Sequence, residues 1–167
     1  MLPVILKGST LEAGLVGHGP ARDRRAALLA DAGVEARLLP DEAPDSLLDG
    51  LQILFVAGLP EGEARDLAVR ARARGILVNV EDRPALCDFH VPAIVRRGDL
   101  LLTASTGGTA PGLARVLGES LGRQFGPEWT ERLRELGLAR AKWRARGLSP
   151  HQVSQEVRAR IAQMGWL

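Results

Sequence analysis

Four short apolar runs, separated by helical segments, constrain the fold of this chain more than any other feature. The runs occupy residues 13–16, 34–39, 53–57 and 76–80. A helix is expected over residues 21–32, where Gly33 stops it, and another from Glu61 to about Arg74, ending at Gly75. Strands that alternate with helices at this spacing form βαβ units. The sequence therefore predicts an α/β, Rossmann-like fold with a mostly parallel sheet.

The rhythm changes in the second half of the chain. Residues 93–96 and 100–105 flank a turn at 97–99, which predicts an antiparallel extension of the sheet or two edge strands. From Pro111 the chain is expected to be helical to its end, with breaks near residues 126–127 and at Gly147. The motif Ser149-Pro150-His151-Gln152 predicts a capping box that starts the last helix. We therefore divide the chain into a Rossmann-like domain, residues 1–110, and a helical region, residues 111–167.

The helical region holds all three tryptophans, Trp129, Trp143 and Trp166. A helical segment of this size is expected to be too small to bury them within itself. This predicts a dimer formed through residues from about 111 onward, unless a further domain covers them.

Charge and hydropathy exclude several classes of protein. The 22 basic residues are interleaved with 20 acidic ones, so a nucleic-acid partner is not indicated. No apolar run approaches the length needed to span a membrane. The single cysteine cannot form an internal disulfide, and the first residues lack the order of a signal peptide. A cytoplasmic location is expected, with no membrane partner.

A glycine turn follows the first predicted strand. Gly17-His18-Gly19 stands where a dinucleotide fold holds pyrophosphate on free backbone N–H groups. The full G-x-G-x-x-G/A pattern needs a small residue at the position of Arg22, and Pro20 removes one backbone donor. Asp41, just beyond the second strand, is either a ribose hydroxyl acceptor or a solvated turn acid. The loop is correspondingly either a nucleotide cradle or an ordinary turn.

The stretch VNVEDRPALCDFHVPAIVRRG, residues 78–98, gathers groups that handle protons and metals. Three interpretations compete: a metal site, an acid/base site beside a ligand, and a polar loop between strands. Asp88 and His90 would share one face and could meet a metal with Cys87. A single cysteine is more often buried than ligating, so no metal ligand is assigned. Glu81 should point away from Asp82, because side chains alternate along an extended segment.

Three motifs in this half of the chain resemble one known family. The segments NVEDRP, FHVPAIVRRG and STGGTAPGLAR are similar to those of the precorrin-2 dehydrogenase / sirohydrochlorin ferrochelatase family, the N-terminal module of siroheme synthases. The resemblance runs from Leu2 to about Leu121. It implies a homodimer with a Rossmann domain and a helical dimerisation region, which oxidises precorrin-2 to sirohydrochlorin with NAD and in some members inserts iron.

The resemblance also implies roles for individual residues. Asp82 stands at the position of the catalytic aspartate, where it would accept a proton as hydride passes to the nicotinamide. The residues expected to bind NAD are Gly17, His18, Gly19, Pro20, Asp41, Ala57 and Gly58. The residues expected to bind the tetrapyrrole, precorrin-2 or sirohydrochlorin, are Arg83, His90, Arg96, Ser105, Thr106, Gly107 and Gly108. Arginines and the loop before the helix at Pro111 suit its carboxylates.

The departures from the family lie on the cofactor side. Besides Arg22, the segment VAGLPEGE, residues 56–63, replaces the family's usual A-A-T-D-D element beside the nucleotide. Two hypotheses therefore stand. The first is an NAD-dependent precorrin-2 dehydrogenase, with or without iron insertion. The second is a module that has lost its nucleotide and only binds the tetrapyrrole, inserts the metal, or serves as the non-catalytic partner in a dimer.

Overall fold

The computed structural model describes residues 1–167, and the chain forms two compact units, Met1–Val91 and Pro92–Leu167. The first unit contains, in order, η1 (Gly8–Thr10), β1 (Ala13–Gly17), α1 (Gly19–Asp31), β2 (Arg37–Leu39), α2 (Asp45–Leu48), β3 (Ile53–Ala57), α3 (Glu61–Arg72), β4 (Leu77–Val80) and η2 (Pro84–Leu86). The second contains β5 (Ala93–Arg97), β6 (Leu100–Ala104), α4 (Pro111–Gln124), α5 (Trp129–Ala145) and α6 (Pro150–Gln163).

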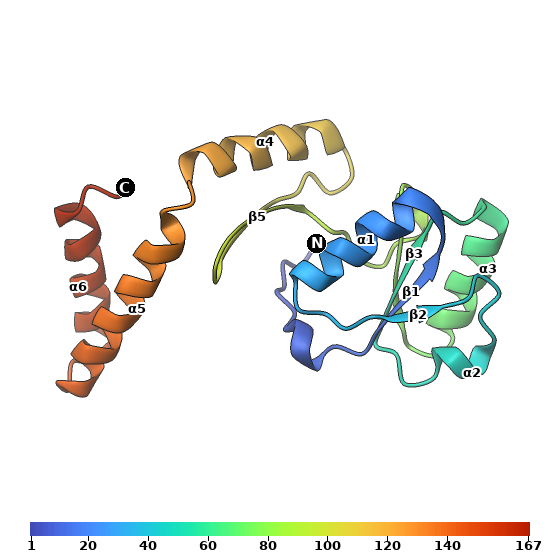
Figure 1. Ribbon diagram of the computed structural model, residues 1–167, viewed down its shortest axis with the longest axis horizontal. Coiled ribbons are helices and arrows are strands. Elements are labelled where there is room, and N and C mark those ends of the chain that lie inside the picture. Colours follow the sequence, from blue (N-terminus) through green and yellow to red (C-terminus); the bar gives the residue numbers. More distant parts are fainter. The chain divides into compact units, whose positions relative to one another are not determined.

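The first unit is a four-stranded parallel sheet with helices on both faces (Figure 1). The strand order is β2-β1-β3-β4, and every neighbouring pair is parallel. This confirms the predicted α/β, Rossmann-like fold. The edge strand β2 is shorter than predicted, because the chain adopts strand geometry only where it pairs with β1, at residues 37–39.

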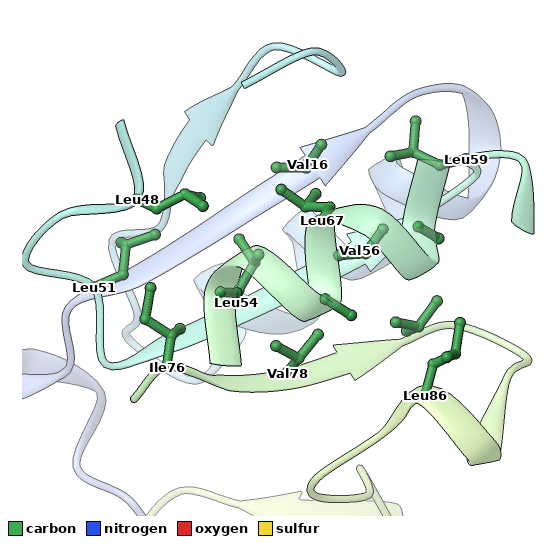
Figure 2. Close-up of a cluster of buried hydrophobic side chains, with 14 residues drawn as sticks. Val16, Leu48, Leu51, Leu54, Val56, Leu59, Leu67, Ile76, Val78 and Leu86 are labelled. Carbon is green, nitrogen blue, oxygen red and sulfur yellow. The ribbon is translucent and has the colours of Figure 1, made fainter. Parts of the chain in front are cut away.

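Two apolar layers hold the first unit together, one on each face of the sheet. Successive residues of the central strands belong to opposite layers: Phe55 packs with Leu29 of α1, whereas Val56 packs with Leu67 of α3. Figure 2 shows the α3 side, where side chains from β1, β3 and β4 meet that helix. Both faces of the central strands are therefore buried, which explains why they read as continuous apolar runs in the sequence.

The second unit begins with an antiparallel hairpin on which α4 packs. β5 and β6 pair antiparallel, but they form a sheet of their own and do not extend the parallel sheet or lie at its edges. Gly118 of α4 faces the hairpin closely, since a Cβ built there would lie 3.1 Å from the Ala93 Cβ. Arg97 donates from Nε to the Phe125 carbonyl at 2.9 Å and from a terminal nitrogen to the Gly122 carbonyl at 3.1 Å. These bonds satisfy carbonyls at the end of α4 and attach the helix to β5.

The contact between hairpin and α4 also bears on the division of the chain. We expected residues 1–110 to form one domain, yet the 93–104 hairpin lies in the same compact unit as the three C-terminal helices.

An aromatic cluster stabilises the second unit. Trp129 is only 7% exposed, and its ring centroid lies 5.1 Å from that of Phe125 and 6.4 Å from that of Trp166. The guanidinium of Arg132 stacks on both tryptophan rings, 5.1 and 5.3 Å from their centroids. The expectation that the helical region cannot bury its tryptophans is thus wrong for Trp129, because the end of α4, the start of α5 and the C-terminal residues enclose it.

The last helix begins where the sequence predicted. The Ser149 side chain accepts from the Gln152 amide and the Gln152 side chain accepts from the Ser149 amide, which completes the capping box. Helix α6 packs on α5, with an ion pair between Arg160 and Glu135. None of the helices is both long and apolar enough to cross a membrane.

Candidate active site

The candidate site of the first unit lies at the carboxyl edge of its sheet. β1, β3 and β4 run in the same direction, with Gly17 beside Ala57 and Val56 beside Val80. The segments that follow these three strands therefore meet at one edge. They contribute His18, Gly58 and Asp82. Open α/β sheets bind their ligands at this edge, so the parallel order brings together the predicted nucleotide loop and the predicted catalytic acid.

Two glycines allow the loops after β1 and β3 to approach each other. A Cβ on Gly17, whose φ is +122°, would lie 1.7 Å from the Ala57 carbonyl oxygen. A Cβ on Gly58, at φ +83°, would lie 2.2 Å from the His18 carbonyl oxygen. No side chain fits at either position. The predicted cofactor residues Gly17, Ala57 and Gly58 therefore fix the backbone of the loop, whatever else they do.

The start of α1 offers backbone donors to an anion. His18 is the N-cap, in extended conformation and without a side-chain capping bond, and the helix begins at Gly19, two residues earlier than predicted. Pro20 lacks an N–H, but those of Gly19 and Ala21 precede the first intrahelical bond. A Cβ on Gly19 would meet nothing within 4 Å, so the space in front of this turn is open. These features fit a pyrophosphate group.

The side chain of Arg22 is already engaged within α1. Its Nε lies 2.9 Å from the Asp23 carboxylate, and the side chain is two-thirds buried. The guanidinium therefore lies beside the carboxylate of its neighbour without a hydrogen bond from Nε, at the position where the dinucleotide pattern has a small residue.

Asp41 lies beside the glycine loop. It follows β2, and its Oδ2 is 2.6 Å from Nδ1 of His18. The two side chains are 38% and 62% exposed, respectively. The sequence predicted both residues for the cofactor but did not predict their contact, because they are 23 positions apart.

Asp82 occupies a turn immediately after β4. Its φ is +59°, the only positive value among the non-glycine residues, and aspartate is one of the few residues that tolerate this region. The turn is fixed by two backbone bonds, from Glu81 to the Val56 carbonyl at 2.9 Å and from Arg83 to the Val80 carbonyl at 3.3 Å. The residue is exposed, and its carboxylate has no hydrogen-bond partner within the chain. An acid held this way is available to a ligand.

The neighbours Cys87 and Asp88 have structural partners instead. The Cys87 sulfur accepts from the Val80 amide at 3.3 Å and lies 3.2 Å from the Val80 carbonyl. Asp88 accepts two bonds from Nε of Arg72, at 2.9 and 3.1 Å, and one from the Val78 amide at 2.9 Å. Nowhere do three or more His, Cys, Asp or Glu side chains gather in a way that could hold a metal ion. These two residues thus tie the loop to β4 and α3.

The remaining polar residues of the first unit differ in whether their side chains already have partners within the chain. Arg83 donates to the Leu59 carbonyl at 3.0 Å, which links the turn after β4 to the loop after β3. His90 is half-buried, and its ring has no hydrogen-bond partner within the chain. Glu81 points toward α1, with its carboxylate 3.5 Å from Arg24.

Arg25 of α1 is a residue that the sequence reasoning missed. Its guanidinium stacks on Phe55, 5.3 Å from the ring centroid, and one terminal nitrogen is buried without a hydrogen-bond partner. Burial lowers its pKa, while the nearby negative charge of Glu81 and Asp82 opposes this. Nothing in the helical pattern distinguished Arg25 from the two other arginines of α1, Arg22 and Arg24.

The predicted tetrapyrrole loop lies in the second unit, between β6 and α4. Ser105 Oγ accepts from the Gly107 amide at 3.2 Å, and Thr106 Oγ1 accepts from the Ala110 amide at 3.2 Å. Gly107 and Gly108 both have positive φ. The loop is therefore a turn fixed by its own side-chain hydrogen bonds, and it precedes a helix of 14 residues. Arg96, on β5, is exposed, and its side chain has no partner within the chain.

The fold and the glycine loop define a Rossmann-type α/β protein, and comparisons with known proteins agree. A family profile described as "Putative NAD(P)-binding" matches residues 4–93. Siroheme synthase of Pseudomonas entomophila (strain L48) is 35% identical over 136 residues, which is 70% of this chain and 29% of that protein. Siroheme synthase of Methylobacillus flagellatus is 36% identical over 137 residues, again 70% and 29%.

A solved structure supports the fold over nearly the whole chain. "SirC, precorrin-2 dehydrogenase" matches with a TM-score of 0.73 and 19% identity, covering 96% of this chain and 89% of that one. The chain belongs to the precorrin-2 dehydrogenase / sirohydrochlorin ferrochelatase family, the N-terminal module of siroheme synthases. It spans about 29% of the length of the curated relatives that it matches.

Proposed function

We propose that this protein oxidises precorrin-2 to sirohydrochlorin with NAD, with Asp82 as the base. The observation that carries the proposal is the free carboxylate of Asp82 at the same sheet edge as the Gly17–Gly19 loop. Family membership supplies the substrate class, because the matched relatives are siroheme synthases. Iron insertion is a further proposal of the same kind, since pyrrole nitrogens must also lose protons to a base.

The residues of the chain divide the work of such an oxidation. NAD, when bound, supplies the hydride acceptor. The amides of Gly19 and Ala21 would hold its pyrophosphate, and Asp41 would accept a hydrogen bond from a ribose hydroxyl. The Asp82 carboxylate accepts the proton that the macrocycle loses.

The loop before α4 is the proposed contact for the substrate's carboxylates. The backbone N–H groups at the start of a helix attract anions, and the two glycines leave the backbone uncovered. Arg96 has a free guanidinium that could pair with a further carboxylate. His90 and Arg83 remain proposed substrate residues of the first unit.

An anaerobic assay with precorrin-2 tests the proposed function. We expect sirohydrochlorin to form only when NAD is present, as followed by its absorbance. A folded protein that binds the tetrapyrrole but gives no nucleotide-dependent product would overturn the dehydrogenase proposal. It would support the alternative module without a nucleotide, which the replaced VAGLPEGE segment and the buried Arg22 motivate.

We also propose that the protein is a homodimer joined through α4. The glycine-bearing side of this helix packs on β5, while Leu113, Val116 and Leu117 are exposed on the other side at helical spacing. Burying this row against a second copy would remove apolar surface from water.

Light scattering at micromolar concentration tests the homodimer. The wild-type chain is expected at twice its monomer mass, and Val116→Glu is expected to shift it to the monomer. Arg115→Ala, on the opposite side of α4, serves as the control and should leave the mass unchanged. A wild-type monomer at high micromolar concentration would contradict the proposal.

A further inference from the structure

The contact between His18 and Asp41 joins two parts of the nucleotide loop region that the fold alone does not connect. His18 lies between β1 and α1, and Asp41 follows the edge strand β2. Nδ1 of the imidazole and Oδ2 of the carboxylate are 2.6 Å apart. An ionised carboxylate only accepts hydrogen bonds, so Nδ1 carries the proton that is shared.

This hydrogen bond leaves defined groups for a ligand. Oδ1 of Asp41 and Nε2 of His18 have no partner within the chain, and both side chains are solvent-accessible. Oδ1 of Asp41 is therefore free to accept from a hydroxyl group, and the negative charge of the carboxylate opposes a phosphate dianion.

We infer that His18 and Asp41 act as one unit that selects NAD over NADP. This inference rests on the proposed nucleotide-dependent function. Oδ1 of Asp41 accepts a hydrogen bond from a hydroxyl of the adenosine ribose, and the charge of the carboxylate repels the 2′-phosphate of NADP. His18 is a positioning residue, because its Nδ1–H holds the carboxylate in the orientation that presents Oδ1.

The location of Asp41 explains why it needs such a partner. β2 has only three residues and pairs on one side only, and the aspartate lies in the turn beyond its end. A free side chain there would lose rotamer freedom on binding a ligand. The hydrogen bond from His18 restricts that freedom beforehand, and because both groups are partly exposed we expect an effect of a few-fold.

A double-mutant cycle read by calorimetric titration with NAD and with NADP tests the inference. Asp41→Asn should weaken NAD binding about tenfold, the scale of one hydrogen bond to a charged group, and leave NADP binding unchanged or tighter. His18→Ala should weaken NAD binding about threefold to fivefold in the wild-type background. It should have no further effect in the Asp41→Asn background, because its role passes through that carboxylate.

Matched variants separate positioning from a general effect on the loop. His18→Asn keeps a donor for Asp41 and should restore most of the NAD affinity that His18→Ala loses. Glu42→Gln removes a neighbouring charge, and His151→Ala removes a histidine of the second unit. Both should leave the preference for NAD unchanged.

Each other outcome has a defined meaning. The inference is overturned if His18→Ala weakens the binding of NAD and of NADP by the same factor. It is also overturned if His18→Ala weakens NAD binding as much in the Asp41→Asn background as in the wild type, because His18 then does not act through Asp41. If the wild type binds NAD but all variants bind both nucleotides as it does, the inference fails and the proposed function stands. If the wild type binds neither nucleotide, both are overturned.

Discussion

Asp82→Asn is expected to lower the turnover of precorrin-2 by about a hundredfold or more, the scale of losing a general base. Asparagine has the shape of aspartate and also tolerates the positive φ at this position, so the turn after β4 should keep its conformation. It cannot accept the proton. The rate of sirohydrochlorin formation at saturating NAD measures the loss, while tetrapyrrole binding, followed by absorbance titration, should survive.

Asp82→Gly separates a chemical role of the carboxylate from a structural one. Glycine removes the side chain and also relieves the cost of the left-handed conformation, so stability should hold or rise slightly. Turnover should still fall as far as in Asp82→Asn. His90→Ala is expected to leave dehydrogenation nearly intact. Full activity in both Asp82 variants, with loss of activity in His90→Ala, would show that the base has been assigned to the wrong residue.

Gly17→Ala is expected to unfold or severely destabilise the first unit. The new Cβ would lie 1.7 Å from the Ala57 carbonyl oxygen, and this oxygen belongs to β3, which pairs with β1 along its whole length. Relief therefore requires the two central strands to separate. Strain and overpacking together suggest a loss of about 4 kcal/mol, a large fraction of the stability of a small domain.

Gly19→Ala is the matched control, because it has positive φ but nothing within 4 Å of the added Cβ. It should cost only about 1 kcal/mol. Urea unfolding followed by circular dichroism reports both units, whereas tryptophan fluorescence reports the second unit alone, since Trp129, Trp143 and Trp166 all lie there. Gly17→Ala with the same unfolding midpoint as Gly19→Ala would contradict the interlocked glycine loop.

The fold was largely predictable because its central strands are buried on both faces. β3 was predicted with the bounds that it has, and the capping box located the start of α6 to the residue. β2 was predicted too long, since Val34 is apolar for packing under α1 and not for pairing. The burial of Trp129 was missed, because it depends on Trp166 returning to it from the far end of the chain.

The candidate site was predictable where a motif carried it. The glycine loop and Asp82 could be located from local pattern and family resemblance. The His18–Asp41 bond, the Arg72–Asp88 pair and the buried guanidinium of Arg25 could not, because each joins residues from different elements. From the sequence, Cys87 and Asp88 were considered as metal ligands. Their hydrogen bonds to β4 and α3 show that such polar residues can be required simply to hold a loop in place.

The close approach of the two loops has a consequence for how this site can change over evolution. On one side of His18 the backbone is confined by the Ala57 carbonyl, and its own carbonyl confines Gly58. The path of the chain through this turn is therefore determined by main-chain atoms alone. The side chain of residue 18 points away from these contacts and reaches Asp41. Position 18 can thus accept different side chains on an unchanged frame, so a new nucleotide preference could arise here by single substitutions without a new loop.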